Sequence, residues 1–259
     1  MNRWRWLILL LVITAAGGAY GFWRSNHPMV ENARSIVSSH LGLPRRFPGK
    51  SVEERLQGTG FALGDPILLR IFKQERKLEI WRGKRGRFQL ALNYDICQWS
   101  GTLGPKLREG DGQSPEGFYF ASARQLNPNS SYHRAINIGF PNNYDQAQGR
   151  TGSFLMIHGA CVSIGCYAMT DSGIDDIYRL VEAALKSGQK SIPIHIFPFR
   201  LTAENLAAHK ESAWAAFWNN LAEGDRLFLK SGEAPQVSVC GGRYRFGKPE
   251  ASCQVVTPW

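Results

Sequence analysis

Short segments in which apolar and polar residues alternate dominate the middle of this chain, and glycine- and proline-rich turns separate them. In residues 87–96, for example, Phe88, Leu90 and Leu92 are in phase. A period of two places alternate side chains on one face of a strand. Similar segments occupy residues 66–73, 77–82, 117–121, 132–140, 153–158 and 192–196. Many short strands with such turns predict a mostly β fold, either a β-sandwich or a β-barrel.

Two helical segments interrupt and follow the predicted strands. Ser172, with Asp175 three residues later, is typical of a helix N-terminus, and Gly188 ends the helical spacing that follows. Residues 203–223 predict a second helix with an apolar stripe. The pattern divides the chain into a stalk at 25–63, a main β domain with one inserted helix at 64–200, and a small helical and loop-rich C-terminal appendage at 201–259.

An almost uncharged segment from Trp6 to Trp23 follows Arg3 and Arg5 at the N-terminus. Its length is sufficient to span a bilayer, and the basic residues before it predict that this end stays in the cytoplasm. Residues 1–24 are therefore predicted to be a signal anchor in the inner membrane, with the rest of the chain in the periplasm. The small residues at 14–19 leave an alternative open, in which a cleaved signal releases a soluble periplasmic protein.

The overall charge narrows the choice of partners. The 259 residues carry a formal net charge of +10, which favours an anionic partner such as nucleic acid, acidic lipid or an acidic polymer. The basic residues are scattered and no nucleic-acid-binding motif occurs, so nucleic acid is not predicted as a partner. A solvated basic surface explains the charge equally well.

The chain has five cysteines, and an odd number in an exported protein suggests disulfides plus one free thiol. Cys240 and Cys253 enclose a glycine-rich segment and are predicted to form one disulfide. Cys97 and Cys161 are predicted to form the second. This pairing leaves Cys166 as the free thiol.

The segment from His158 to Cys166 contains the residues best suited to catalysis. The histidine ends a predicted strand and the cysteine follows eight residues later, close enough for the imidazole to activate the thiol. Gly165 permits a tight turn that exposes the sulfur and directs main-chain N–H groups at a carbonyl. Two alternatives remain: zinc binding by His158, Cys161 and Cys166, for which no fourth ligand has the usual spacing, or an ordinary buried cysteine.

Residues 157–171 (IHGACVSIGCYAMTD) resemble the signature of the L,D-transpeptidase catalytic domain family (YkuD type) and are most similar to its YafK-like branch. Residues 114–119 (SPEGFY) and 132–145 (YHRAINIGFPNNYD) resemble further segments of that family. The resemblance covers residues 64–200, which become the predicted catalytic domain. It implies an L,D-transpeptidase-type β fold and attack on an amide of a peptidoglycan peptide stem through a thioester.

The same resemblance assigns roles to individual residues. It implies that Cys166 is the nucleophile, that His158 is the general base, and that the N–H groups around Gly165 and Cys166 bind the oxyanion. It implies no metal and no cofactor. Ser163 is predicted to contact the substrate or to orient the turn.

Two positions depart from the family pattern, because Ile164 stands where a histidine is usual and Ala168 where an arginine is usual. Arg134 is predicted to bind the carboxylates of the peptide stem instead, with an ordinary surface arginine as the alternative.

The YafK-like branch is associated with cleaving the amide that joins an outer-membrane lipoprotein to the wall. Hydrolysis of that amide is therefore the predicted activity, with the wall stems, the lipoprotein and the cytoplasmic membrane as predicted partners. Two alternatives remain. The first is an L,D-transpeptidase that forms cross-links or attaches the lipoprotein, and the second is an inactive tethered module that binds the wall.

Overall fold

The computed structural model describes residues 51–57, 59–84 and 86–258. Within these ranges no helix is both long and apolar enough to cross a membrane. The anchor predicted at residues 1–24 and most of the stalk predicted at residues 25–63 lie outside the described residues.

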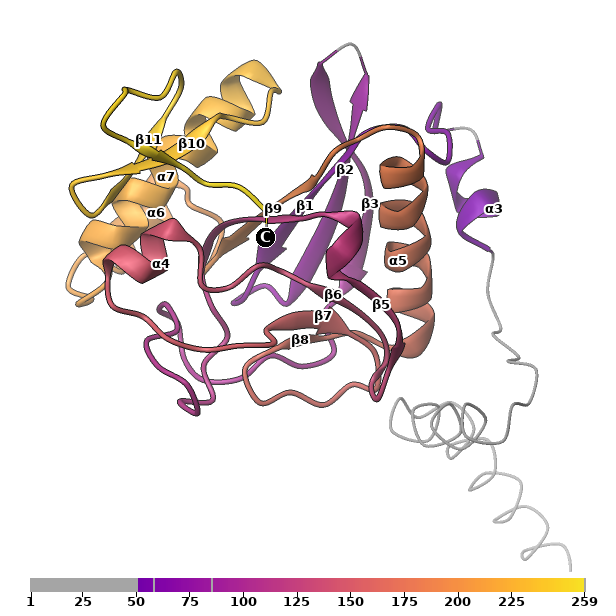
Figure 1. Ribbon diagram of the computed structural model, residues 1–259, viewed down its shortest axis with the longest axis horizontal. Coiled ribbons are helices and arrows are strands. Elements are labelled where there is room, and N and C mark those ends of the chain that lie inside the picture. Colours follow the sequence, from indigo (N-terminus) through magenta and orange to yellow (C-terminus); the bar gives the residue numbers. More distant parts are fainter. Residues whose placement is uncertain (1–50, 58, 85, 259) are drawn as a thin grey trace, which may run out of the picture. The chain divides into compact units, whose positions relative to one another are not determined.

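A five-stranded sheet, here called sheet A, is the largest sheet of the described chain (Figure 1). Its strands are, in spatial order, β3 (Arg87–Asp95), β2 (Lys77–Lys84), β1 (Ile67–Phe72), β9 (Ile192–Phe197) and β4 (Gly117–Ala121). Strands β1 and β9 pair in parallel, whereas the other neighbours pair antiparallel. The prediction of a mostly β fold is confirmed.

The predicted phase of strand β3 is wrong at Leu90, whose side chain is 50% exposed. Ile80 pairs with Leu92, but the next residue, Trp81, pairs with Leu90. One residue, Ala91, is therefore inserted as a bulge. Because side chains alternate between the faces of a strand, an inserted residue moves every side chain beyond it to the other face.

A second sheet, sheet B, holds the segment that is of chemical interest. Its strands are, in order, β5 (Leu126–Ser130), β6 (His133–Asn137), β7 (Met156–His158) and β8 (Tyr167–Ala168). The short helices η1 (Ala123–Gln125) and α4 (Asn143–Ala147) precede β5 and follow β6. The main hydrophobic core joins the two sheets, since it contains Leu69 and Ile71 of β1 together with Ile157 and Tyr167 of β7 and β8.

Helix α5 (Asp171–Lys186) covers this core with its apolar face. It begins earlier than predicted, because Thr170 and not Ser172 is the N-cap and accepts a hydrogen bond from the Gly173 N–H at 3.1 Å. The short helix α3 (Val52–Leu56) adds two buried side chains to the same core. This end of the predicted stalk therefore packs against the main domain.

The C-terminal segment contains two helices and a small sheet. These are α6 (Ala203–Ala208), α7 (Ala215–Ser231), β10 (Val237–Cys240), β11 (Arg243–Phe246) and β12 (Gln254–Val255). The single helix predicted at residues 203–223 is wrong. The chain leaves the helical path at His209, which caps α6 and stacks its ring on Phe199 at 4.3 Å between centroids.

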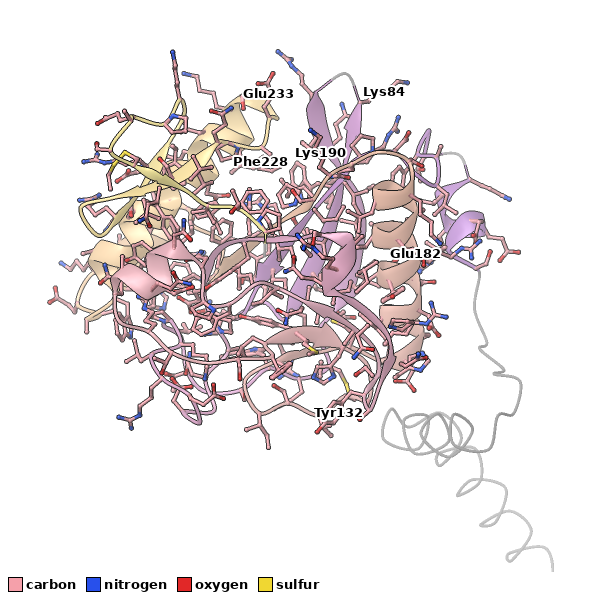
Figure 2. The ribbon with its side chains drawn as sticks, viewed as in Figure 1. Lys84, Tyr132, Glu182, Lys190, Phe228 and Glu233 are labelled. Carbon is pink, nitrogen blue, oxygen red and sulfur yellow. A yellow bond between two sulfur atoms is a disulfide. The ribbon has the colours of Figure 1, made fainter. Side chains whose placement is uncertain are left out.

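A second core joins this segment to the face of sheet A that is turned away from the main core. Phe72, Phe118 and Phe197 of sheet A meet Trp218 and Leu221 of α7 in it. Farther along α7, the ring of Phe228, labelled in Figure 2, lies 5.0 Å from that of Trp81. The C-terminal appendage is thus packed on sheet A through a shared core.

Both predicted disulfides are confirmed. Cys97 pairs with Cys161, and Cys240 pairs with Cys253, with Cα–Cα distances of 5.2 and 4.8 Å. All five cysteines lie within the described residues, and Cys166 is the free one.

Candidate active site

His158 and Cys166 lie on the same face of sheet B. Strand β7 ends at His158 and pairs in parallel with β8, so that Ile157 is opposite Tyr167 and His158 is opposite Ala168. Ile157 and Tyr167 point into the main core. Side chains alternate along a strand, so the neighbours of these two residues point the other way. His158 follows Ile157 and Cys166 precedes Tyr167, and both therefore lie on the outer face.

The imidazole of His158 is held in one orientation. Its Nδ1 lies 2.7 Å from the carbonyl oxygen of Gly159. A carbonyl can only accept, so Nδ1 carries the proton and Nε2 is left with a free lone pair. The ring of Tyr132, at the edge of the molecule in Figure 2, packs on the imidazole with 4.9 Å between centroids. His158 is therefore buried, oriented and in the tautomer that a general base needs.

The turn from Gly159 to Gly165, here called the active-site turn, is fixed at both ends. At its start the Ala160 N–H donates to Asp171 Oδ1 at 2.7 Å, and the Cys97–Cys161 disulfide ties the turn to the segment after β3. At its end Gly165 has a φ of +110°, a conformation that favours glycine. A Cβ at Gly165 would also lie 3.2 Å from Leu155 Cδ1.

Three serines hold the backbone of the cysteine in place. The Cys166 carbonyl accepts from Ser163 Oγ at 2.7 Å and from Ser114 Oγ at 3.0 Å. The Gly165 N–H donates to Ser100 Oγ. The Gly165 N–H is therefore not free to bind an oxyanion. Of the two N–H groups predicted to bind it, the Cys166 N–H is left for this role.

Comparisons with known proteins identify the family of this chain. The family model of the YkuD L,D-transpeptidase catalytic domain matches residues 68–196. YafK, an L,D-transpeptidase-type protein of Escherichia coli K12, is 50% identical over 196 residues, which cover 76% of this chain and 79% of YafK. The chain belongs to the L,D-transpeptidase family.

Two solved structures are more distant from this L,D-transpeptidase-family chain. The helical cell shape determining protein Pgp2 of Campylobacter jejuni is 14% identical, with a TM-score of 0.43, over 80% of this chain and 98% of Pgp2. L,D-transpeptidase 1 of Mycobacterium tuberculosis is 14% identical, with a TM-score of 0.30, over 51% of this chain and 62% of that one. The family assignment rests on the family model and on YafK.

Two of the residues predicted from the family to bind substrate have other partners in this structure. Arg134 is next to Ala135, which pairs with His158, so its side chain leaves the strand on the opposite face. Its Nε pairs with Asp175 at 3.1 Å, and its guanidinium lies over Tyr178 of α5. The Ser163 hydroxyl bonds the Cys166 carbonyl, which supports the role of orienting the turn.

The two positions that depart from the family pattern differ in their surroundings. Ile164 is 89% exposed on the active-site turn, whereas Ala168 is fully buried in β8. The backbone of Ala168 pairs with Gln98 on one side and with His158 on the other. An apolar side chain thus faces solvent close to the thiol in the sequence, and β8 presents only the methyl group of Ala168 on the face that bears His158.

The zinc alternative loses a ligand, because the Cys161 sulfur is in a disulfide. A second cluster, Cys240, Glu250 and Cys253, also contains a disulfide and leaves a single carboxylate. Tyr132, Lys106, Ser100 and Ser114 were not predicted as site residues, although Ser114 and Tyr132 lie in segments that resemble the family. Ser100, Lys106 and Ser114 come from the loop between β3 and β4, and Tyr132 comes from the turn between β5 and β6. Only the fold brings these two loops to the active-site turn.

The electrostatic environment keeps the thiol and the imidazole neutral. Burial raises the pKa of the Cys166 thiol, and the Met156 backbone and the charge of Lys106 oppose this in part. Burial lowers the pKa of His158, and its bond to Gly159 and the charge of Asp171 oppose this in part. Near pH 7 the pair therefore rests as a thiol and a neutral imidazole, and the proton moves when the thiol attacks.

A pH profile tests this resting state. His158 must be neutral to accept a proton, and burial moves its protonation to lower pH. We expect kcat/KM to be retained as the pH falls, with an acid midpoint below about 6.5, the ordinary imidazole value. Alkylation by iodoacetamide reports the thiolate and should rise only above about pH 8.5, the ordinary thiol value. Fast alkylation at pH 6 would instead indicate a preformed thiolate–imidazolium pair.

Proposed function

We propose that this chain is a cysteine acyl-enzyme that acts on peptidoglycan peptide stems, with Cys166 as nucleophile and His158 as general base. The observation that supports this most directly is the oriented imidazole: Nδ1 is bound to the Gly159 carbonyl, and the free Nε2 shares a face with the chain's one unpaired thiol. Membership of the L,D-transpeptidase family supplies the substrate class.

The proposed reaction has two halves. His158 Nε2 takes the thiol proton while the sulfur attacks the amide carbonyl of the stem, and the Cys166 N–H binds the developing oxyanion. The amine then leaves with the proton from His158, and a thioester remains on Cys166. In the second half, water or an acceptor amine gives its proton to His158 and attacks the thioester, which releases the thiol.

We further propose that water is the usual acceptor and that the cleaved amide joins a lipoprotein to the wall diamino acid. Transfer requires a groove that orients the acceptor amine and receives its proton. The positions where the family usually has a histidine and an arginine are Ile164 and Ala168, and neither side chain can handle an amine or a carboxylate. Hydrolysis needs no such groove.

The products released from sacculi distinguish the two outcomes. Sacculi that carry the lipoprotein should release it on incubation with the enzyme, and mass spectrometry of the digest should show free carboxyl groups on the diamino acid. The Cys166→Ala variant is the matched control and should release nothing. A digest that gains cross-links between two diamino acids, with no release, would identify the enzyme as a transpeptidase and contradict the proposed hydrolysis.

The proposed location is the inner membrane, with residues 1–24 as a retained anchor and the catalytic domain in the periplasm. The support is the uncharged segment from Trp6 to Trp23 and the arginines that flank it. Cell fractionation followed by N-terminal sequencing tests this. Recovery of a soluble protein that starts between Ala16 and Asn26 would contradict it.

A further inference from the structure

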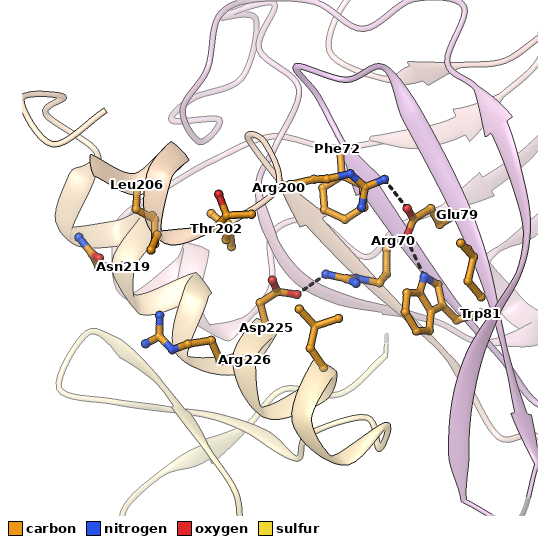
Figure 3. A pocket seen from close by; sticks show the side chains of 14 residues that line it. Arg70, Phe72, Glu79, Trp81, Arg200, Thr202, Leu206, Asn219, Asp225 and Arg226 are labelled. Carbon is orange, nitrogen blue, oxygen red and sulfur yellow. Dashed lines mark hydrogen bonds and ion pairs between the residues drawn. The ribbon is translucent and has the colours of Figure 1, made fainter. Parts of the chain in front are cut away.

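A cavity of about 800 Å³ lies between sheet A and helices α6 and α7 (Figure 3). Strands β1, β2 and β3 form one wall, and α6, α7 and the segment before α6 form the other. The cavity is on the face of sheet A that bears the second core. His158 and Cys166 lie on the outer face of sheet B, beyond the main core, so this cavity is separate from the candidate active site.

Two ion pairs run along the wall of the cavity, as Figure 3 shows. Arg70 pairs with Asp225, and both side chains are buried. Arg200 pairs with one oxygen of Glu79, and the other oxygen accepts from Trp81 Nε1 at 2.7 Å. Both oxygens of Glu79 are therefore occupied. Arg200, which lines the cavity and whose side chain is 46% exposed, has further N–H donors besides the one that pairs with Glu79.

The cations of this wall are in excess and one donor is unused. Arg70, Arg200 and Arg226 stand against Glu79 and Asp225, three positive charges against two negative. Arg70 Nε is buried without a hydrogen-bond partner among the described residues. A buried donor without a partner is destabilising, and an acceptor in the cavity would satisfy it. Charge and hydrogen bonding both favour an anion.

The rest of the lining is apolar and partly open to solvent. Leu90 of β3 and Leu229 of α7 both line the cavity and are 50% and 56% exposed. Trp81 and Leu206 also contribute apolar surface. Covering such side chains removes apolar area from water, which is favourable.

We propose that this cavity binds a small amphiphilic anion, with its anionic head at Arg200 and Arg70 and its apolar body along Trp81, Leu90 and Leu229. The volume is in the range of pockets for small ligands, and a mostly apolar lining with a few convergent polar groups is typical of them. A single acyl chain that ends in a carboxylate or a phosphate has this chemistry. The bound molecule contacts both sheet A and α7 and holds them together.

Calorimetric titration of the full-length protein tests the ligand chemistry. Decanoate and decyl phosphate are the probes with both a head and a body; acetate and inorganic phosphate lack the body, and decanol lacks the charge. We expect saturable one-to-one binding of decanoate, decyl phosphate or both, at least ten-fold tighter than that of the other three. Preference for one of the two identifies a carboxylate or a phosphate ligand. Equal binding of decanol or of the simple anions, or no saturable binding, would overturn the proposal.

Matched variants test the place of binding. Leu229→Gln should weaken decanoate binding at least ten-fold. Leu227→Gln is the control: Leu227 lies on the same helix, is 45% exposed and does not line this cavity. This change should leave decanoate binding unchanged. Both leucines are exposed, so folding should be preserved, as thermal melts can verify. Equal weakening by the two changes would overturn the proposed site.

Two further variants separate this site from the thiol. Arg200→Gln should weaken the anionic probes, whereas Arg243→Gln, which removes another exposed paired arginine, should not. Cys166→Ala should bind decanoate like the unaltered protein, whatever the outcome of the wall assay. Loss of binding in Cys166→Ala would place the ligand at the thiol and overturn the proposal.

Discussion

Replacing Cys166 or His158 by alanine is expected to abolish activity on sacculi while the fold remains intact. Loss of a nucleophile or of its base typically lowers kcat by about 10⁴- to 10⁶-fold. Because the two side chains act as a unit, the double variant should be little worse than either single variant. Release of wall-linked peptide gives the rate, and circular dichroism with thermal melts verifies the fold.

His209→Gln is the matched control for the histidine. His209 lies in the C-terminal segment, where it packs on Phe199, so its replacement should leave the rate unchanged. Near-normal turnover by Cys166→Ala would show that Cys166 is not the nucleophile. Losses that multiply in the double variant would show that His158 has a role apart from the thiol.

Lys73→Met is expected to be the most destabilising single change outside the hydrophobic cores. Lys73 is fully buried, and its three ammonium hydrogens are shared among four acceptors within reach: Glu116 Oε1 at 2.9 Å and the backbone carbonyls of Thr102, Gly104 and Ser114. Glu116 also accepts from Trp218 Nε1 at 2.8 Å. Removing the ammonium leaves a buried carboxylate without its cation, which costs about 3–5 kcal/mol. Urea unfolding measures the loss.

The surface pair of Lys77 and Asp95 supplies the control. Lys77→Met should change the free energy of unfolding by no more than about 0.5 kcal/mol, because exposed ion pairs contribute little. Lys73→Met with Glu116→Gln should recover part of the loss, because no buried charge is left unpaired. A Lys73→Met variant as stable as Lys77→Met would show that this buried pair is not a stabilising feature.

Lys73→Met should also alter the backbone around the candidate nucleophile. Lys73 holds the Ser114 carbonyl, and Ser114 Oγ holds the Cys166 carbonyl. Ser114, in the long glycine-rich loop between β3 and β4, is thus bonded both to a buried cation and to the backbone of the candidate nucleophile. Through this link Lys73, directly after β1, is expected to affect the thiol without contacting it.

The sequence by itself determined the features that depend on local pattern. Strands β1 and β2 follow from their alternation and α5 from its apolar spacing, and a strand end followed by a glycine turn identified His158 and Cys166 as the candidate pair. The cysteine count, the short glycine-rich segment between Cys240 and Cys253, and the assignment of Cys166 as the free thiol predicted both disulfides. In each case the information lies within a few residues along the chain or in the number of cysteines.

Only the tertiary structure decided where hydrogen-bonding groups and charges find their partners. Arg70 meets Asp225 across 155 residues, and Glu116 meets Trp218 across 102, so neither pair leaves a periodic signal in the sequence. The bulge at Ala91 that exposes Leu90 depends on pairing with β2. The Gly165 N–H and the Arg134 guanidinium were predicted to serve the substrate, but Ser100 and Asp175 occupy them. These donors bond the acceptors that the packing brings within reach, and the packing is decided between segments that are distant along the chain.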